Sequence, residues 1–313
     1  MTAVEVPVVD LGSADVVTSL ASAYETVGFA QLVGHGVPRD LITAVFEASA
    51  RFHELSLEEK LAIELDRHHR GYIAIDTSTD RRSELGPASE PNQSASFMMM
   101  REAGPDDPDV LAGHYLAGPN QWPAIDGFRD VLEQYAATME QLGRTVLDHF
   151  MTALGTTVPD GALDPPTSWL RLLHYPARPG RPGSFGSAPH VDFGAITLLA
   201  QDTVGGLQVQ GPDGGWLDVP PIDDALVLNT GSVMRHWSNG RFKATPHRVV
   251  NDPQRERFSV AYFLDPHVAT VVDGLDGPWT DAPYVFGDFL RAELETGYDR
   301  HARSSRPPRS ANT

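Results

Sequence analysis

The sequence has 313 residues, 41% hydrophobic and 21% charged, which is ordinary for a globular protein of one large or two small domains. It contains no cysteine, so disulfides, thiolate metal sites and a cysteine nucleophile are excluded. The formal net charge of −18 argues against a nucleic-acid partner, and neither a membrane span nor a secretory signal is visible, so we expect a cytoplasmic protein.

The first half of the chain mixes strand-like and helix-like segments. The helix-like segments carry apolar residues at helical spacing. Ser56-Leu-Glu-Glu59 is a capping-box signature and predicts a break in the second helix. We expect short strands over residues 6–10 and 29–33, and helices over residues 13–27 (with Ser13 as the N-cap), 38–65 and 128–154.

Residues 66–120 show a less regular pattern. Residues 78–93 are polar, charged and contain glycine and proline, so a loop is expected there. The three methionines at 98–100 are expected in the core or in a pocket wall, because thioether sulfur is a poor ligand for a hard metal ion.

From Ser168 onward, short β-prone runs alternate with glycine, proline and aspartate. This pattern is typical of an antiparallel barrel or jelly roll. Asp213-Gly214 predicts the turn of a hairpin. A final helix is expected within residues 283–298, where it could cover a pocket mouth, and the basic tail over residues 301–313 is expected to be disordered.

Metal-ligating side chains cluster in this strand-rich region. His190 and Asp192 lie two residues apart, so in an extended chain both side chains point to the same side. A lone His-x-Asp is usually a surface or hydrogen-bonded pair. Here, however, His247 follows, and Arg257-x-Ser259 forms a second pair at the same spacing. Two histidines and a carboxylate with open positions are typical of non-haem Fe(II) oxygenases. A third imidazole, in the Gly34-His-Gly36 turn, is expected to be structural.

These residues resemble the iron(II)/2-oxoglutarate-dependent dioxygenases, in the branch that includes isopenicillin N synthase. The similarity covers roughly residues 6–265 and includes several further phrases in the same order. They are Val6-Pro-Val-Val-Asp10, Gly28-Phe29, Gly34-His-Gly-Val-Pro38, Gly118-Pro-Asn-Gln-Trp-Pro123, Trp216-Leu-Asp-Val-Pro-Pro221, Leu228-Asn-Thr-Gly-Ser232 and Ser238-Asn-Gly240.

The resemblance implies a mainly β fold with flanking helices. Its centre would be a double-stranded β-helix (jelly-roll) barrel with a helix-rich N-terminal region. We divide the chain into a mixed N-terminal region over residues 1–120, a jelly-roll oxygenase domain with supporting helices over residues 121–300, and the tail.

The resemblance also implies the ligands. Fe(II) would be held by His190, Asp192 and His247, and 2-oxoglutarate by Arg257, Ser259 and Tyr175, with dioxygen completing the reaction. Leu173 stands where relatives often carry asparagine, so any hydrogen bond from that asparagine is missing or supplied elsewhere.

The implied activity is hydroxylation, desaturation or cyclisation of a small molecule, in secondary metabolism, with release of succinate and CO2. Ascorbate would serve as the reductant in vitro. The alternatives are an Fe(II) oxidase that uses dioxygen without 2-oxoglutarate, and a non-catalytic metal-dependent binding module. We expect a monomer or weak homo-oligomer without nucleic-acid or membrane partners. Candidate substrate contacts, chosen by proximity in the sequence, are Phe193, Arg235, Phe263, Met98 and Arg101.

Overall fold

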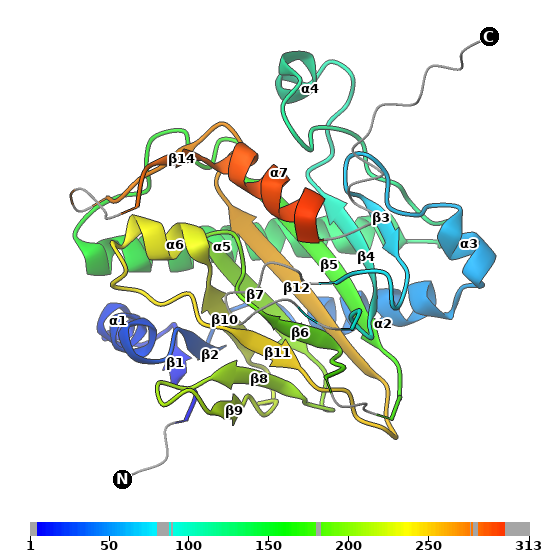
Figure 1. The fold of residues 1–313 in the computed structure, drawn as a ribbon, viewed down its shortest axis with the longest axis horizontal. Coiled ribbons are helices and arrows are strands. Elements are labelled where there is room, and N and C mark those ends of the chain that lie inside the picture. The colour runs from blue at the N-terminus through cyan, green and yellow to red at the C-terminus, as the bar shows by residue number, and fades with distance from the viewer. Residues whose placement is uncertain are drawn as a thin grey trace.

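The computed structural model describes residues 5–79, 88, 90–179, 183–275, 277 and 281–297, and two facing β-sheets form its centre (Figure 1). The expected tail over residues 301–313 lies outside the described residues. The major sheet has the strand order β1-β2-β10-β7-β12-β5-β4-β3. These strands are β1 (Val8–Asp10), β2 (Phe29–Val33), β10 (Leu226–Thr230), β7 (Ile196–Gln201), β12 (Arg257–Asp265), β5 (Thr167–Tyr175), β4 (Ala95–Met100) and β3 (Gly71–Ile73).

The minor sheet lies across one face of the major sheet and has the order β6-β11-β8-β9 (Figure 1). Its strands are β6 (Ser187–His190), β11 (His247–Val249), β8 (Leu207–Gln210) and β9 (Trp216–Asp218), and a separate pair joins β13 (Val271–Val272) to β14 (Tyr284–Val285). Apart from the parallel β1–β2 pair, the strands within these sheets pair antiparallel, as expected for a jelly roll.

Helices cover the other face of the major sheet. The long helix α5 runs behind the sheet in Figure 1, and α2 and α5 both contact strands β5 and β12. Gly143 of α5 sits against Leu264, where an added Cβ would lie 3.0 Å from the leucine Cδ2. The helices are α1 (Val16–Thr26), α2 (Arg39–Glu54), α3 (Leu57–Leu61), α4 (Pro108–Ala112), α5 (Phe128–Leu154), α6 (Ser232–Trp237) and α7 (Phe286–Gly297).

Several local predictions are confirmed, and one needs correction. Strand β2, helix α5 and the capping box at Ser56 appear as expected. The first helix begins at Val16 with Asp15 as its N-cap, and not with Ser13. Residues 11–15 form turns that place Ser13 before the helix, and its hydroxyl donates to the Asp15 carboxylate.

Strand β4 was not predicted, and it ties the N-terminal region to the barrel. All six of its residues are buried, so the strand lacks the alternation of apolar and polar residues that marks a half-exposed strand. It pairs with β5 from Ala95 opposite His174 to Met100 opposite Trp169. Residues on both sides of position 120 therefore build one sheet together.

A buried histidine beneath this sheet makes stability depend on pH. His53 lies on α2, where its Nε2 lies 3.3 Å from the carbonyl oxygen of Leu172. Burial, followed by the repulsion of His174, lowers the pKa of His53 from 6.5 to about 3. Below pH 6.5 the His53 imidazole is therefore protonated in the unfolded chain but neutral in the folded protein. The free energy of unfolding falls for this reason as the pH drops toward 3.

We expect His53→Gln, whose amide can still donate to the Leu172 carbonyl, to flatten this dependence. Between pH 7 and pH 5 the variant should lose about 2 kcal/mol less free energy of unfolding than the wild type. Urea unfolding of the metal-free proteins at both pH values measures the difference. An equal loss of the free energy of unfolding in the two proteins would contradict the assignment of this pH dependence to His53.

Candidate metal centre and co-substrate pocket

Three metal-ligating side chains meet where the two sheets face each other. His190 ends β6 and His247 begins β11, and the two residues are directly opposite in the antiparallel pair. Asp192 follows β6, and its Oδ1 lies 3.6 Å from His190 Nε2 and 3.7 Å from His247 Nε2. One carboxylate oxygen and two imidazole nitrogens thus converge on one point and could hold one metal ion.

The hydrogen bonds of the two rings leave the converging nitrogens free to bind. His190 Nδ1 lies 2.8 Å from the carbonyl oxygen of Ala188, and His247 Nδ1 lies 3.3 Å from that of Thr245. A carbonyl oxygen only accepts, so each Nδ1 carries the proton and each Nε2 presents its lone pair. Burial, followed by the repulsion of His190, lowers the pKa of His247 to about 4, which keeps this ring neutral and able to bind a metal at neutral pH.

The carboxylate of Asp192 is fixed from behind. Its Oδ2 accepts hydrogen bonds from Thr197 Oγ1 at 2.5 Å and from Asn229 Nδ2 at 2.7 Å, which leaves Oδ1 to face the histidines. Burial alone would raise the pKa of Asp192, but His247, His190 and these two hydrogen bonds lower it below its ordinary value. The group therefore stays ionised in a buried place. Asn229 was not among the predicted site residues, although an asparagine within the apolar strand β10 is a visible signal in the sequence.

Asn229→Leu should weaken the metal site without removing a ligand. Loss of one outer hydrogen bond frees the Asp192 carboxylate to rotate, and such partners are typically worth roughly 10- to 100-fold in metal affinity. Anaerobic calorimetric titration with Fe(II) measures the change. Unaltered affinity, in a variant whose circular dichroism matches the wild type, would show that Thr197 alone positions the carboxylate.

A cavity of about 70 Å³ extends from the metal ligands to a buried arginine. Arg257 begins β12, is 1% exposed, and lies over the ring of Tyr175 at 4.7 Å. Its Nη1 donates to Ser259 Oγ at 3.2 Å, whereas Nε and Nη2 are buried without a hydrogen-bond partner. Leaving donors of a buried cation unsatisfied is costly, so this arrangement fits an anion that enters the cavity. Leu173 also lines the cavity, at the position where relatives often carry asparagine.

A second cavity of about 80 Å³ opens next to the metal ligands His190 and Asp192, and its walls are largely apolar. Leu294 of α7 closes one side, and Figure 1 shows this helix over the end of the barrel. The candidate substrate contacts Met98, Phe193 and Phe263 line this cavity.

The other two candidates, Arg101 and Arg235, line neither cavity. Arg101 is bound by Asp107 at 2.6 Å and is directed toward another polar cluster, and Arg235 lies on α6. Proximity in the sequence did not place these two side chains at the site.

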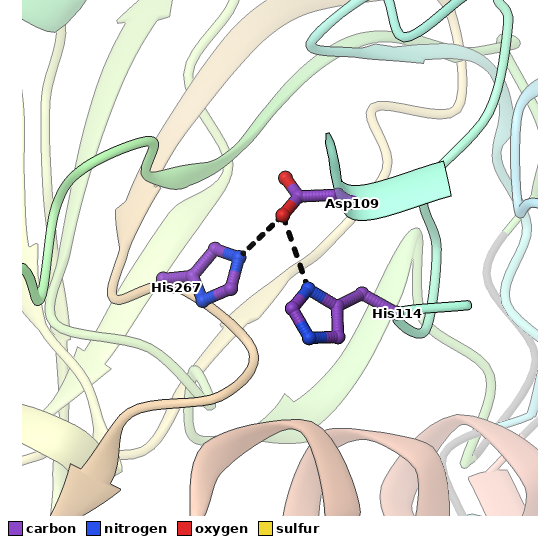
Figure 2. Close-up of side chains that lie close together, drawn as sticks. All are labelled: Asp109, His114 and His267. Atoms are coloured by element: carbon purple, nitrogen blue, oxygen red, sulfur yellow. Dashed lines mark hydrogen bonds and ion pairs between the residues drawn. The ribbon is translucent and has the colours of Figure 1, made fainter. Parts of the chain in front are cut away.

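A second group of two histidines and an aspartate lies away from these cavities (Figure 2). Asp109 Oδ1 is 3.0 Å from His114 Nδ1 and 3.1 Å from His267 Nε2. His267 Nδ1 accepts the N–H of Ala269 at 3.2 Å, so in the neutral ring Nε2 carries the proton and donates to Asp109. The proton thus occupies the position that a metal ion would need, which is the opposite of the arrangement at His190 and His247.

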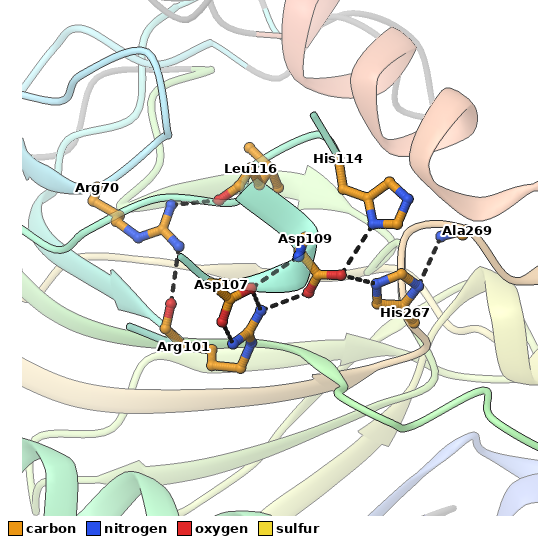
Figure 3. A network of polar contacts seen from close by, with 8 residues as sticks. All are labelled: Arg70, Arg101, Asp107, Asp109, His114, Leu116, His267 and Ala269. Atoms are coloured by element: carbon orange, nitrogen blue, oxygen red, sulfur yellow. Dashed lines mark hydrogen bonds and ion pairs between the residues drawn. The ribbon is translucent and has the colours of Figure 1, made fainter. Parts of the chain in front are cut away.

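This second group belongs to a network that joins distant segments (Figure 3). Arg101 binds Asp107 and Asp109 at 2.6 and 2.5 Å. Arg70, which is 2% exposed, donates to the carbonyl oxygens of Leu116 and Arg101. The network anchors the loop around α4 to the barrel, and we assign it a structural role.

Comparison with known proteins gives the family. The profile described as the 2OG-Fe(II) oxygenase superfamily matches residues 166–266, and that described as the non-haem dioxygenase in morphine synthesis N-terminal region matches residues 6–125. A 2-oxoglutarate-Fe(II) type oxidoreductase of Emericella nidulans is 38% identical over 80% of this chain and 74% of its own length. The chain belongs to the 2OG-Fe(II) oxygenase superfamily.

Other proteins agree with this family in sequence and in fold. The clavatol oxidase of Penicillium crustosum is 35% identical over 91% of both chains. A Neurospora crassa protein, crystallised in complex with alpha-KG (2-oxoglutarate) and thymine, has a TM-score of 0.78, with 27% identity over 91% of this chain and 95% of that one. The jelly-roll fold implied by the sequence is confirmed.

The protein is therefore a 2-oxoglutarate-dependent non-haem iron oxygenase, which uses Fe(II), 2-oxoglutarate and dioxygen and acts on a small molecule. Two features of the site fit Fe(II) and 2-oxoglutarate. The unprotonated Nε2 atoms of the two histidines and the ionised Asp192 can bind the metal, and the donors of Arg257 that lack a partner can bind a carboxylate. Within the described ranges, no helix is both long and apolar enough to cross a membrane.

Proposed function

We propose that this oxygenase hydroxylates, desaturates or cyclises a small molecule of secondary metabolism, and that it releases succinate and CO2. The relative named as a clavatol oxidase supports a small-molecule substrate of this kind. The single observation that carries the proposal is one continuous site. In it, three ligand atoms converge beside a cavity that ends at a buried arginine with two unused donors.

The proposed roles follow from the contacts. His190, Asp192 and His247 hold Fe(II) on one side and leave the other side open. The far carboxylate of 2-oxoglutarate would accept from Arg257, whose planar fork suits two-point binding, with hydroxyl donors from Ser259 and Tyr175. Iron and 2-oxoglutarate, when bound, supply the oxidising power drawn from dioxygen.

The remaining residues position the substrate and exclude water. Phe193, Phe263 and Met98 form apolar walls beside the metal ligands, and α7 closes one side of the cavity. A C–H bond held against such walls is oriented toward the metal, whereas bulk water is kept out. The ligand set and both cavities are complete within one chain, which supports a monomer or weak homo-oligomer. We place the enzyme in the cytoplasm, where Fe(II) and 2-oxoglutarate are available together.

Dioxygen consumption by the purified protein, with Fe(II), ascorbate and 2-oxoglutarate, tests the proposal when succinate is assayed in parallel. Succinate that forms only when both iron and 2-oxoglutarate are present is the expected result. Dioxygen uptake without succinate, once candidate substrates are added, would instead support an Fe(II) oxidase. Metal binding without any uptake would support a non-catalytic binding module.

A further inference from the structure

A second arginine reaches the metal-adjacent cavity, and neither the family motif nor the roles above use it. Arg171 lies on β5 between Trp169 and Leu173, and these alternate residues all face the cavities. Arg171 lines both the cavity of Arg257 and the apolar cavity beside His190 and Asp192. Its guanidinium therefore lies between the place for 2-oxoglutarate and the place for the substrate.

The guanidinium is held in position from one side only. Its Nε donates to Ser96 Oγ at 3.0 Å, and Ser96 is 1% exposed on the neighbouring strand β4. Within the described part of the chain, no carboxylate forms an ion pair with Arg171, and its Nη groups donate to no protein acceptor. These donors are available to a ligand in the cavity.

The one carboxyl group beyond Asp192 that lines this apolar cavity does not compensate Arg171. Asp265 Oδ1 instead accepts the backbone N–H of Ala195 at 3.1 Å. Burial, together with the nearby Asp192, raises the pKa of Asp265 well above its ordinary value.

Apart from Asp265, whose Oδ1 is held by the N–H of Ala195, the charged groups of the loaded site include one cation that no anion balances. The dipositive metal and Arg257 balance Asp192 and the two carboxylates of 2-oxoglutarate. This cation is the half-buried Arg171, which forms no ion pair within the described part of the chain, and a ligand with a single negative charge would neutralise it. Besides Arg171, Asp265 and the metal ligands, the side chains that line the cavity are apolar, and the large ones are Ile73, Met98, Trp169, Phe193, Phe263 and Leu294.

We propose that Arg171 is the substrate anchor and that the substrate is a small carboxylic acid with an aromatic or alicyclic body. The acid group would accept from the Nη atoms of Arg171, and the body would pack between Trp169, Phe193 and Phe263. This geometry places a carbon of the body, and not the acid group, toward the metal ligands. The inference rests on the proposed function, because it names the substrate class of the same site.

Calorimetry on the anaerobic enzyme with Fe(II) and saturating 2-oxoglutarate tests the anchor. Saturation keeps Arg257 occupied, so that added acids cannot bind there. The probes are benzoate, phenylacetate and 3-phenylpropanoate, each compared with its neutral primary amide. At least one acid should bind the wild type roughly 10- to 100-fold more tightly than its amide, the range expected for a charge-assisted contact.

Arg171→Gln should remove this preference for the acid, and Arg171→Lys should keep part of it. Arg129→Gln, which removes an equal charge from the exposed face of α5, is the control and should bind like the wild type. A preference for acids that survives in Arg171→Gln would overturn the inference. So would a wild type that binds no acid of the series, or binds amides equally well.

The dissociation constant of 2-oxoglutarate, measured on the same proteins without probes, separates the possible failures. A wild type that binds 2-oxoglutarate normally but shows no preference for acids refutes the anchor alone. A wild type that binds no 2-oxoglutarate and forms no succinate refutes the proposed function itself. If Arg171→Gln weakens 2-oxoglutarate more than tenfold, Arg171 serves the co-substrate and the anchor is refuted.

Discussion

Asp192→Asn is expected to abolish Fe(II)-dependent succinate formation. The amide oxygen can still accept from Thr197 and Asn229, so the strands around the site stay in place. The carboxylate charge between the two imidazoles is lost, however, and a neutral amide is a poor ligand for Fe(II). Fe(II) affinity should therefore fall by more than the roughly 10- to 100-fold attributed to an outer hydrogen-bond partner. Anaerobic Fe(II) titration and the succinate assay measure both effects.

Asp109→Asn provides a matched control in the other His/His/Asp group (Figure 2). The His267 proton lies between its ring and Asp109, where a metal ion would have to sit. We therefore expect this variant to bind one equivalent of Fe(II) and to form succinate as the wild type does. It should be less stable, because the network through Arg101 is weakened. If Asp109→Asn bound less than one equivalent of Fe(II) while Asp192→Asn still bound one, the group around Asp109 would be the iron site and the group around Asp192 would not.

Arg257→Met is expected to weaken 2-oxoglutarate binding without lowering the melting temperature of the 2-oxoglutarate-free protein. Without the guanidinium, the buried carboxylate of 2-oxoglutarate would face an apolar side chain, and truncation of one partner of a buried charge pair typically costs at least roughly 30-fold in affinity. The 2-oxoglutarate-free variant should nevertheless melt no lower than the wild type, because two buried donors without partners disappear with the charge.

Thermal unfolding with and without 2-oxoglutarate measures both parts of this result. The wild type should gain stability on addition of 2-oxoglutarate, and Arg257→Met should not. Arg255→Met, two residues earlier and exposed beside Asp252, is the control and should respond as the wild type does. A full response in Arg257→Met would remove Arg257 from the co-substrate site.

The local parts of the site could be predicted from the sequence. The spacing of two residues predicts that His190 and Asp192 share a side of a strand, whereas His247 was predicted from the family resemblance, and the structure brings all three together. The same alternation holds on β5, where the resemblance assigned Tyr175 to 2-oxoglutarate binding and the structure places it in the lining of the Arg257 cavity. It could also have placed Arg171, four residues earlier, on the same side.

Contacts between distant segments could not be predicted in this way. Strand β4 is buried on both faces, so its sequence lacks the alternation that would reveal it. Asp109 and His267 are separated by 158 residues, and nothing local indicates that they meet. Arg101 is adjacent in the sequence to the pocket-lining strand β4, but its guanidinium binds Asp107 and Asp109, which follow it closely in the sequence and belong to the same network as His267.

The direct pairing of His190 with His247 has a consequence for how the chain reaches its native state. If β11 slipped by one residue along β6, Arg248 would take the place of His247 and the ion would lose a ligand. Iron binding should therefore stabilise the correct alignment of these strands, since only that alignment brings all three ligands together. These two strands are only four and three residues long, so few backbone hydrogen bonds fix their alignment.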